Sequence, residues 1–275
     1  METAKDLLGV SGGLAVNGRV NQFLRTQMLL GAPAMARLAA ARVVVVGLGA
    51  VGSYAAEALA RAGVGHLRLV DFDEIRPTNL NRQLYALHST LGRAKAEVAR
   101  ERILDINPRC EVEALKVFGD QQTRPHLLAG ADALVDAIDS VGPKFGLLRD
   151  AVQAGLPIII SSMGAAERTD PTQIRVADLA KTDRCPLARF MRKRLRTVGI
   201  KGGITCVFST ELPRKTPRAM QAAALENPAE KDVLERGRQR KPLGSLPTLT
   251  GIFGLTAANV VIMRIAGKKP DEVTT

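Results

Sequence analysis

A run of four valines leads directly into a glycine-rich turn, and this pair of features constrains the fold most. Residues 43–52 read VVVVGLGAVG, in which Gly47, Gly49 and Gly52 have the spacing G-x-G-x-x-G. A short β-branched run that ends in glycine is typical of a buried parallel strand. The first glycine of such a turn permits a tight bend, the second lets the backbone approach a phosphate, and the third packs the next helix on the strand. The turn therefore predicts an α/β fold that binds a nucleotide.

Helical and extended patterns alternate along the first half of the chain. Helices are predicted over 20–40, 53–62, 91–107 and 143–154, and strands over 42–46, 66–70, 111–117, 133–138 and 157–162. This alternation predicts a doubly wound, mostly parallel sheet with helices on both faces. Ligands of such sheets bind beyond the carboxyl ends of the strands. Gly47, Asp71 and Asp139 are all expected at those ends.

The character of the chain changes near residue 165. Between Arg184 and Arg218 there are ten Arg or Lys and one acidic residue, and residues 212–247 contain five prolines. We expect two units, 1–165 and a basic C-terminal extension over 166–275, with a mobile loop near 212–247. A core helix is expected over 249–266. Its apolar stretch is short for a bilayer span and includes Asn259, so no transmembrane segment is predicted.

Composition limits the classes of partner. The formal net charge of +12 predicts a polyanion, either nucleic acid or an anionic membrane surface. Three cysteines without a C-x-x-C pair argue against a disulfide framework and against structural zinc, and they suit a reducing cytoplasm. The absence of Trp and the presence of only two Tyr argue against a base-stacking surface for single strands.

A set of polar residues follows the glycine turn. Asp71 lies 19 residues after Gly52, near the spacing at which an acid binds ribose hydroxyls. Up to this point a nicotinamide-dependent oxidoreductase explains the pattern equally well. The segments NLNRQ and GRAK then add Asn79, Arg82, Gln83 and Lys95. Several donors directed at phosphates suit nucleotidyl transfer, because charge builds on the α-phosphate and on the leaving pyrophosphate.

Asp139 and two cysteines each have two interpretations. Asp139, in DAIDS, could hold Mg²⁺ that bridges phosphate oxygens, or could cap the helix that starts near Pro143. Cys206 lies in a strand-like run and is expected to be buried and inert. Cys185 precedes a helix start, where a thiolate would be favoured.

Five motifs in order, GLGAVGS, VDFD, NLNRQ, GRAK and DAIDS, resemble the adenylation domain of the ubiquitin-activating-like superfamily, which includes the ThiF and MoeB families. The resemblance covers about residues 20–165. It implies a Rossmann-like fold and a homodimer, in which an arginine near the N-terminus, here Arg25, reaches the phosphates bound by the partner. It also implies an ATP site lined by Asp71, Asp73, Asn79, Arg82, Gln83, Lys95 and Asp139.

The second half departs from ThiF and MoeB, because it lacks their two C-x-x-C zinc motifs. Its segments SSMGAAERTDPTQIRVADLAKTDRCPLARFMRKRLR and ITCVFSTELP resemble the tRNA threonylcarbamoyladenosine dehydratase family. Members of that family use ATP to close a ring on a modified adenosine beside the anticodon. The resemblance implies ATP, Mg²⁺ and tRNA as ligands. Phosphates of the tRNA would be neutralised by Arg189, Arg192, Lys193, Arg194 and Arg196, expected on or near one helix.

The resulting hypothesis is ring closure through an acyl adenylate. Arg82, Lys95 and Arg25 of the partner subunit would stabilise phosphate charge, Asp71 would bind ribose and Asp139 the metal. No cysteine is assigned a catalytic role, because the attacking group is already in the substrate. The alternatives are adenylation of the C-terminal glycine of a ubiquitin-like sulfur carrier, with a sulfur-transfer protein as a further partner, a nicotinamide-dependent oxidoreductase, and a catalytically inactive RNA-binding module.

Overall fold

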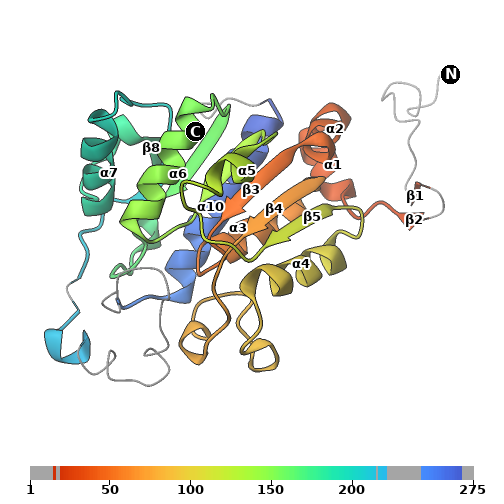
Figure 1. Cartoon of the computed structure of the whole chain (residues 1–275). Coiled ribbons are helices and arrows are strands. Elements are labelled where there is room, and N and C mark those ends of the chain that lie inside the picture. The colour runs from red at the N-terminus through yellow and green to blue at the C-terminus, as the bar shows by residue number, and fades with distance from the viewer. Residues whose placement is uncertain (1–14, 17–18, 215, 222–242, 268–275) are drawn as a thin grey trace.

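The computed structural model describes residues 15–16, 19–214, 216–221 and 243–267 (Figure 1). Within these residues one seven-stranded sheet has the order β5-β4-β3-β6-β7-β9-β8, and β1 and β2 form a separate antiparallel pair. The strands are β1 Ala15–Val16, β2 Arg19–Val20, β3 Arg42–Val46, β4 His66–Val70, β5 Glu111–Leu115, β6 Ala133–Asp136, β7 Ile158–Ser162, β8 Ile174–Asp178 and β9 Thr205–Ser209. The helices are α1 Leu24–Leu30, α2 Ala32–Ala40, α3 Gly52–Arg61, α4 Lys95–Ile106, α5 Arg124–Leu128, α6 Val141–Gln153, α7 Pro186–Arg196 and α10 Pro247–Ile265.

The sheet is parallel except at one edge. β3 pairs with β4 on one side and with β6 on the other, both in parallel, whereas β8 runs antiparallel to β9. The chain therefore leaves β3 toward β4 and β5, and later returns to build the other half of the sheet from β6 onward. This reversal of strand order at β3 and β6 creates the crevice in which ligands of open parallel sheets bind. The predicted doubly wound sheet is confirmed.

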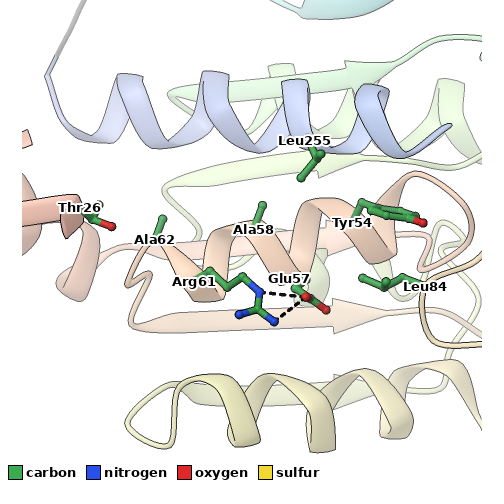
Figure 2. Close-up of a pocket in the computed structure, with 8 residues that line it drawn as sticks. All are labelled: Thr26, Tyr54, Glu57, Ala58, Arg61, Ala62, Leu84 and Leu255. Carbon is green, nitrogen blue, oxygen red and sulfur yellow. Dashed lines mark hydrogen bonds and ion pairs between the residues drawn. The ribbon is translucent and has the colours of Figure 1, made fainter. Parts of the chain in front are cut away.

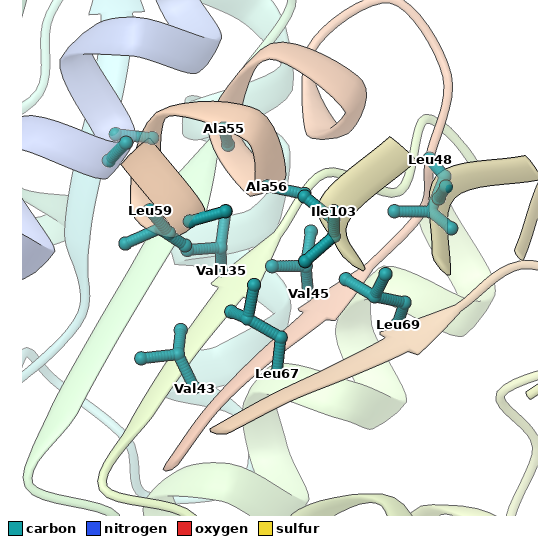
Figure 3. Close-up of a cluster of buried hydrophobic side chains, with 14 of the residues drawn as sticks. Val43, Val45, Leu48, Ala55, Ala56, Leu59, Leu67, Leu69, Ile103 and Val135 are labelled. Carbon is teal, nitrogen blue, oxygen red and sulfur yellow. The ribbon is translucent and has the colours of Figure 1, made fainter. Parts of the chain in front are cut away.

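Alternate side chains of β3 enter two separate cores. Val43 and Val45 pack in a cluster with α3, α4 and α10, part of which is drawn in Figure 3. Val44 and Val46 face the opposite cluster, which includes side chains from α5, α6 and α7. All four valines are buried, as expected for a parallel strand covered by helices on both faces. The central strands are thereby held rigidly, and their carboxyl ends form a fixed edge.

The predicted helix over 20–40 is two helices. Gly31 separates α1 from α2 with a φ of +85°, and its N–H closes α1 by donating to Gln27 O. A left-handed φ favours glycine, and Pro33 then lies in the first turn of α2. Periodicity alone did not reveal the break, because apolar residues continue on both sides of it.

The C-terminal helix α10 belongs to the core. Phe253, Ala257 and Val261 are buried in the cluster on the α3 face, and an added Cβ at Gly254 would lie 2.2 Å from Val51 O. By length and composition alone α10 could also cross a membrane. Its close backbone contact with α3 agrees with the predicted core helix.

Strands from both halves of the chain share the large sheet, because β8 and β9 extend it beyond β7. The boundary at residue 165 stays a prediction. Residues 222–242 of the predicted mobile loop lie outside the described residues. The chain on either side of that segment is joined through Glu167, whose N–H donates to Gly244 O and whose carbonyl accepts from Arg214 N.

Candidate adenylation site

The glycine turn lies at the carboxyl end of β3 and is fixed by close backbone packing. Gly47 has a φ of +90°, and an added Cβ would lie 2.8 Å from Ala137 O. An added Cβ at Gly52 would lie only 1.7 Å from Gly47 O. At Gly49 the nearest atom to an added Cβ is Gln83 Nε2, at 3.6 Å. Backbone packing within the protein thus requires glycine at positions 47 and 52. At Gly49 there is open space, through which a ligand can approach the backbone.

Asp71 joins the end of β4 to the glycine turn. One carboxylate oxygen accepts from Leu48 N at 2.6 Å and the other from Asp73 N at 2.9 Å. Burial raises the pKa of this carboxyl above its ordinary value, while the positive charge of Lys95 acts in the opposite direction. The predicted ribose acid therefore lies beside the predicted phosphate turn, in a partly dehydrated position.

Lys95 begins α4 with its side chain buried. Its Nζ lies 3.1 Å from Asp73 Oδ2, and its backbone N–H donates to Asp73 O. The ammonium group is therefore near two carboxylates, those of Asp71 and Asp73. A buried cation held at a helix N-terminus next to a glycine turn is well placed to bind a phosphate oxygen.

The NLNRQ segment forms a compact turn over the glycines. The buried side chain of Asn79 accepts from Arg76 N, and its carbonyl accepts from the backbone N–H groups of Arg82 and Gln83. Arg82 Nη1 donates to Thr78 O at 2.8 Å, which leaves its guanidinium half-exposed. Asn79 thus shapes the turn, and the turn brings Gln83 toward Gly49 and presents Arg82 at the surface.

An ion pair that the sequence did not reveal holds the loop between β6 and α6, which bears Asp139. Lys144 Nζ lies 2.7 Å from Asp136 Oδ2, and neither side chain is exposed. The same pair holds the peptide of Ile138, because Asp136 Oδ1 accepts from Ile138 N at 3.1 Å and Lys144 Nζ donates to Ile138 O at 2.9 Å. Ile138 directly precedes Asp139. The signal in the sequence was the first aspartate of DAIDS, which falls inside the strand predicted over 133–138.

Asp139 is exposed on the loop between β6 and α6. The N-cap position of α6 is taken by Ser140. Among the described residues no three His, Cys, Asp or Glu side chains form a ligand set for a metal. Mg²⁺ at nucleotide sites usually takes one or two carboxylates together with phosphate oxygens and waters, so a single exposed aspartate at this edge fits such an ion.

Arg25 is exposed on α1, away from the other predicted site residues. An added Cβ at Gly63 would lie 3.5 Å from the ring of Phe23, so α1 starts near the turn between α3 and β4. That turn precedes β4, whereas Gly47 follows β3; because the two strands are parallel, the turn and Gly47 are at opposite ends of the strands. The fold brings together Gly47, Gly49, Gly52, Asp71, Asp73, Asn79, Gln83 and Lys95, and Arg25 is not among them.

The predicted basic residues are on helix α7 or at its end. Arg189, Lys193, Arg194 and Arg196 are exposed, whereas Arg192 points inward and donates from Nη1 to Leu179 O and Thr182 O. The acceptors of Arg192 are loop carbonyls before α7, so this side chain fastens the helix to the protein. The sequence predicted these residues on or near one helix but could not show which guanidinium donates to the protein's own carbonyls.

The three cysteines are free and buried within the described part of the chain. Cys206 lies in β9, and burial raises the pKa of its thiol far above the ordinary value. Burial also raises the pKa of Cys110, to about 11. The expectation of a buried thiol at Cys206 is confirmed, and neither of these two groups is poised to form a thiolate.

The fold, together with the polar residues at the carboxyl ends of the strands, defines a Rossmann-like nucleotide-binding domain equipped for chemistry at phosphates. The family model described as "ThiF family" matches residues 23–275. The chain therefore belongs to the ThiF family, and the predicted membership is confirmed.

Curated relatives and solved structures are similar over most of the chain. The tRNA threonylcarbamoyladenosine dehydratase of Escherichia coli is 39% identical over 260 residues, which cover 90% of this chain and 94% of the relative. The Bacillus subtilis dehydratase is 45% identical over 195 residues, which cover 70% and 76%. The crystal structure of the E. coli dehydratase in complex with ATP superposes with a TM-score of 0.77 at 36% identity, and the match covers 93% of this chain and 98% of that one.

Relatives that adenylate other substrates match a shorter part. The molybdopterin-synthase adenylyltransferase of Salmonella typhimurium is 36% identical over 145 residues, which cover 53% of this chain and 57% of that protein. Similarity to the dehydratases continues into the basic second half.

Proposed function

We propose that this protein is an ATP-dependent tRNA threonylcarbamoyladenosine dehydratase. The observation that carries the proposal is the extent of the match to the E. coli dehydratase, which includes both the adenylation edge and the basic half. Sulfur-carrier adenylation is the weaker alternative, because its relative matches about half of the chain. A nicotinamide-dependent oxidoreductase is also a weaker alternative, because hydride transfer has no use for the phosphate-directed Lys95 and Arg82.

The first step is formation of an acyl adenylate. An oxygen of the threonyl carboxylate attacks the α-phosphate of ATP, and the bond to pyrophosphate breaks. The glycine turn and the first turn of α3 receive the phosphates, since the first N–H groups of a helix have no acceptor within the helix and carry a partial positive charge. Lys95 and Arg82 stabilise the negative charge that develops on the transferring and leaving groups.

The second step is closure of the ring. The neighbouring carbamoyl group attacks the activated carbonyl, a proton is lost, and AMP leaves with one of the former carboxylate oxygens. The net change in the nucleoside is the loss of one water molecule. Because both reacting groups belong to one nucleoside, this step is effectively intramolecular and needs no enzyme thiol. Cys110, Cys185 and Cys206 are all buried, in agreement with a reaction that uses no enzyme thiol.

Asp139 is proposed to hold Mg²⁺ when ATP binds. A bound Mg²⁺ would supply positive charge to the phosphate oxygens. The protein's contribution is the position of the carboxylate, because the loop before Asp139 is held by the buried Asp136–Lys144 pair.

A homodimer is proposed across the face formed by α1, α3 and α10. A groove of about 430 Å³ lies there, lined by Thr26, Tyr54, Glu57, Ala58, Arg61, Ala62, Leu84 and Leu255 (Figure 2). On the same helix as Thr26, Met28 and Leu29 are 78% and 77% exposed. Large apolar side chains grouped at an open groove mark an interaction surface. A second copy docked here would bring Arg25, on the same helix, toward the site of its neighbour.

The tRNA is proposed to bind along α7. Arg189, Lys193, Arg194 and Arg196 are exposed there, and the helix contains no acidic residue. The C-terminal end of α7 contacts α6, which starts directly after the Asp139 loop. Backbone phosphates bound on α7 would therefore lie near the edge where the nucleotide binds. A cytoplasmic location and a sulfur-transfer partner stay predictions.

The proposal is tested by ATP–pyrophosphate exchange with the full-length protein. Exchange is expected with tRNA that carries threonylcarbamoyladenosine, and neither with unmodified tRNA nor with a ubiquitin-like carrier protein. Lys95→Ala and Asp139→Ala should abolish exchange and AMP release while the protein stays folded. Arg100→Ala is the matched control, since it removes a cation from the exposed side of the same helix α4. Exchange with the carrier alone, or wild-type AMP release by Lys95→Ala, would refute the proposal.

A further inference from the structure

The basic face of α7 contains an exposed aromatic ring. Phe190 is 47% exposed, although phenylalanine is usually buried. It lies one helical turn before Arg194, whose guanidinium carbon is 5.9 Å from the centroid of the Phe190 ring. The same guanidinium lies 4.3 Å from the ring centroid of Phe145 on α6. One guanidinium thus contacts two aromatic rings, one on α6 and one on α7.

This stack is near the candidate adenylation edge. Phe145 belongs to the beginning of α6, which starts two residues after Asp139. Arg194 belongs to the last turn of α7, so the contact joins that end of α7 to the start of α6. Arg149, one turn further along α6, approaches Phe145 at 5.9 Å.

The chemistry of the surface selects the kind of partner. Lys193 and Arg194 lie three and four residues after Phe190 and therefore on the same side of the helix, so two cations flank the ring. An apolar protein surface that covered Phe190 would also bury these charges without partners, which is costly. RNA offers both components at once, because phosphates pair with the cations and every base has a flat face that stacks on an aromatic ring or a guanidinium plane.

We propose that Phe190 and Arg194 form a stacking site for one unpaired base of the RNA substrate. This site rests on the proposed tRNA function. The stacked base would hold the tRNA loop that contains the reacting adenosine. The scarcity of aromatic residues in the sequence argued against a base-stacking surface, and this proposal departs from that expectation at one position. A single exposed ring beside a guanidinium plane is sufficient to stack on one base.

The test uses full-length protein and a synthetic hairpin with the sequence of an anticodon stem-loop, with 2-aminopurine placed at each loop position in turn. Stacking quenches the fluorescence of 2-aminopurine, so one loop position should be quenched on binding to the wild type. Phe190→Ala should abolish that quenching and weaken binding about 5- to 150-fold, the range expected for loss of one stacked base. Phe190→Tyr should bind as the wild type does. Phe190→Leu, which is apolar without a π-face, should behave like the alanine variant.

Salt dependence separates stacking from phosphate contacts. Phe190→Ala should leave the slope of log affinity against log salt unchanged, because no charge is removed. Arg189→Gln should reduce that slope by about 1. Arg194→Lys keeps the charge but lacks the planar group, so it should weaken binding with little change in slope. Val176→Ala, at a 41% exposed position on β8, is the matched apolar control and should bind normally.

The outcomes are distinguishable. If the wild type binds the hairpin and Phe190→Ala binds equally well with unchanged quenching, the stacking site is wrong and the tRNA function stands. If the wild type does not bind the hairpin but binds phosphatidylserine vesicles, and Phe190→Ala weakens that binding, the surface is a membrane contact. Both the stacking site and its tRNA partner are then contradicted.

Discussion

Lys144 and Asp136 form an ion pair in which neither side chain has any exposed surface, with Nζ and Oδ2 2.7 Å apart. Ser161 Oγ donates to the same carboxylate oxygen at 2.6 Å. Two buried charges are costly to dehydrate, and their mutual attraction and hydrogen bonds offset that cost. The pair also holds both the N–H and the C=O of Ile138, so its role extends to the loop that bears Asp139.

Removal of one partner should destabilise the protein strongly. In Lys144→Met the carboxylate of Asp136 is left without a cation in the core. We expect the free energy of unfolding to fall by about 3–5 kcal/mol, measured by chemical denaturation. The double variant Asp136→Asn/Lys144→Met removes both charges from this buried position and should recover most of that loss.

The same double variant separates a positioning role from a structural one. It lacks the Lys144 donor to Ile138 O, so the loop before Asp139 is no longer held. Small displacements of catalytic groups cost about a hundredfold in turnover, so ATP–pyrophosphate exchange should stay low although stability has returned. Recovery of wild-type exchange together with stability would show that the pair acts only on the fold.

Two glycines of the turn should respond differently to alanine. An added Cβ at Gly49 meets only Gln83 Nε2 at 3.6 Å, so Gly49→Ala should fold with a near wild-type melting temperature. The methyl group would occupy the approach of a phosphate. Overpacking costs about 1–3 kcal/mol, so ATP affinity measured by calorimetry should fall about 5- to 150-fold.

Gly52→Ala is the contrasting variant, because its Cβ would lie 1.7 Å from Gly47 O. The backbone must move, and we expect little folded protein. A stable Gly52→Ala variant, or unchanged ATP affinity in Gly49→Ala, would contradict the packing and the ligand path described for the turn.

Subunit mixing tests whether Arg25 acts on the neighbouring site. Arg25→Ala and Lys95→Ala should each be inactive alone. Co-expression of the two variants should restore measurable AMP formation, because a mixed dimer contains one site with Lys95 from its own chain and Arg25 from the partner subunit. Leu29→Glu, at a 77% exposed apolar position on α1, should abolish both the dimer in sedimentation and this recovery. Full activity of a monomer would exclude the arrangement.

The dependence of ATP affinity on pH, on the acid side, should follow the protonation of the Asp71 carboxyl. Burial raises the pKa of its carboxyl, so Asp71 becomes protonated at a higher pH than an ordinary aspartate with a pKa of 3.8. The carboxylate form accepts the ribose hydroxyls, so ATP affinity should decrease as the pH falls through the raised pKa.

Lys95 lowers the pKa of Asp71 through its charge. Lys95→Met should therefore move the titration of the Asp71 carboxyl to higher pH, as followed by carbon NMR of the ligand-free protein. An unchanged or lower pKa in this variant would show that Lys95 does not act on Asp71.

Local patterns predicted most of the adenylation edge. The valine run, the glycine spacing and the alternation of strands and helices depend on neighbours in the chain, and parallel topology then places Gly47 and Asp71 at one edge. Residues whose role depends on distant packing were not predictable in this way. No local pattern distinguishes Lys144 from an ordinary helix cation, and the inward direction of Arg192 depends on carbonyls of a separate loop.

The antiparallel edge strand β8 was missed for a related reason. Its burial pattern does not alternate regularly, and its place in the sheet depends on pairing with β9, which lies about thirty residues later. The contacts of Arg194 with Phe145 and Phe190 likewise join two helices separated in the chain.

The fate of the threonyl carboxylate oxygens tests the central claim most directly. A tRNA whose threonylcarbamoyladenosine carries heavy oxygen in that carboxylate is incubated with ATP and the full-length protein, and AMP and the nucleoside are analysed by mass spectrometry. The account predicts that one labelled oxygen appears in AMP for each nucleoside that has lost water. Label that is absent from AMP while the nucleoside cyclises would contradict an acyl-adenylate intermediate.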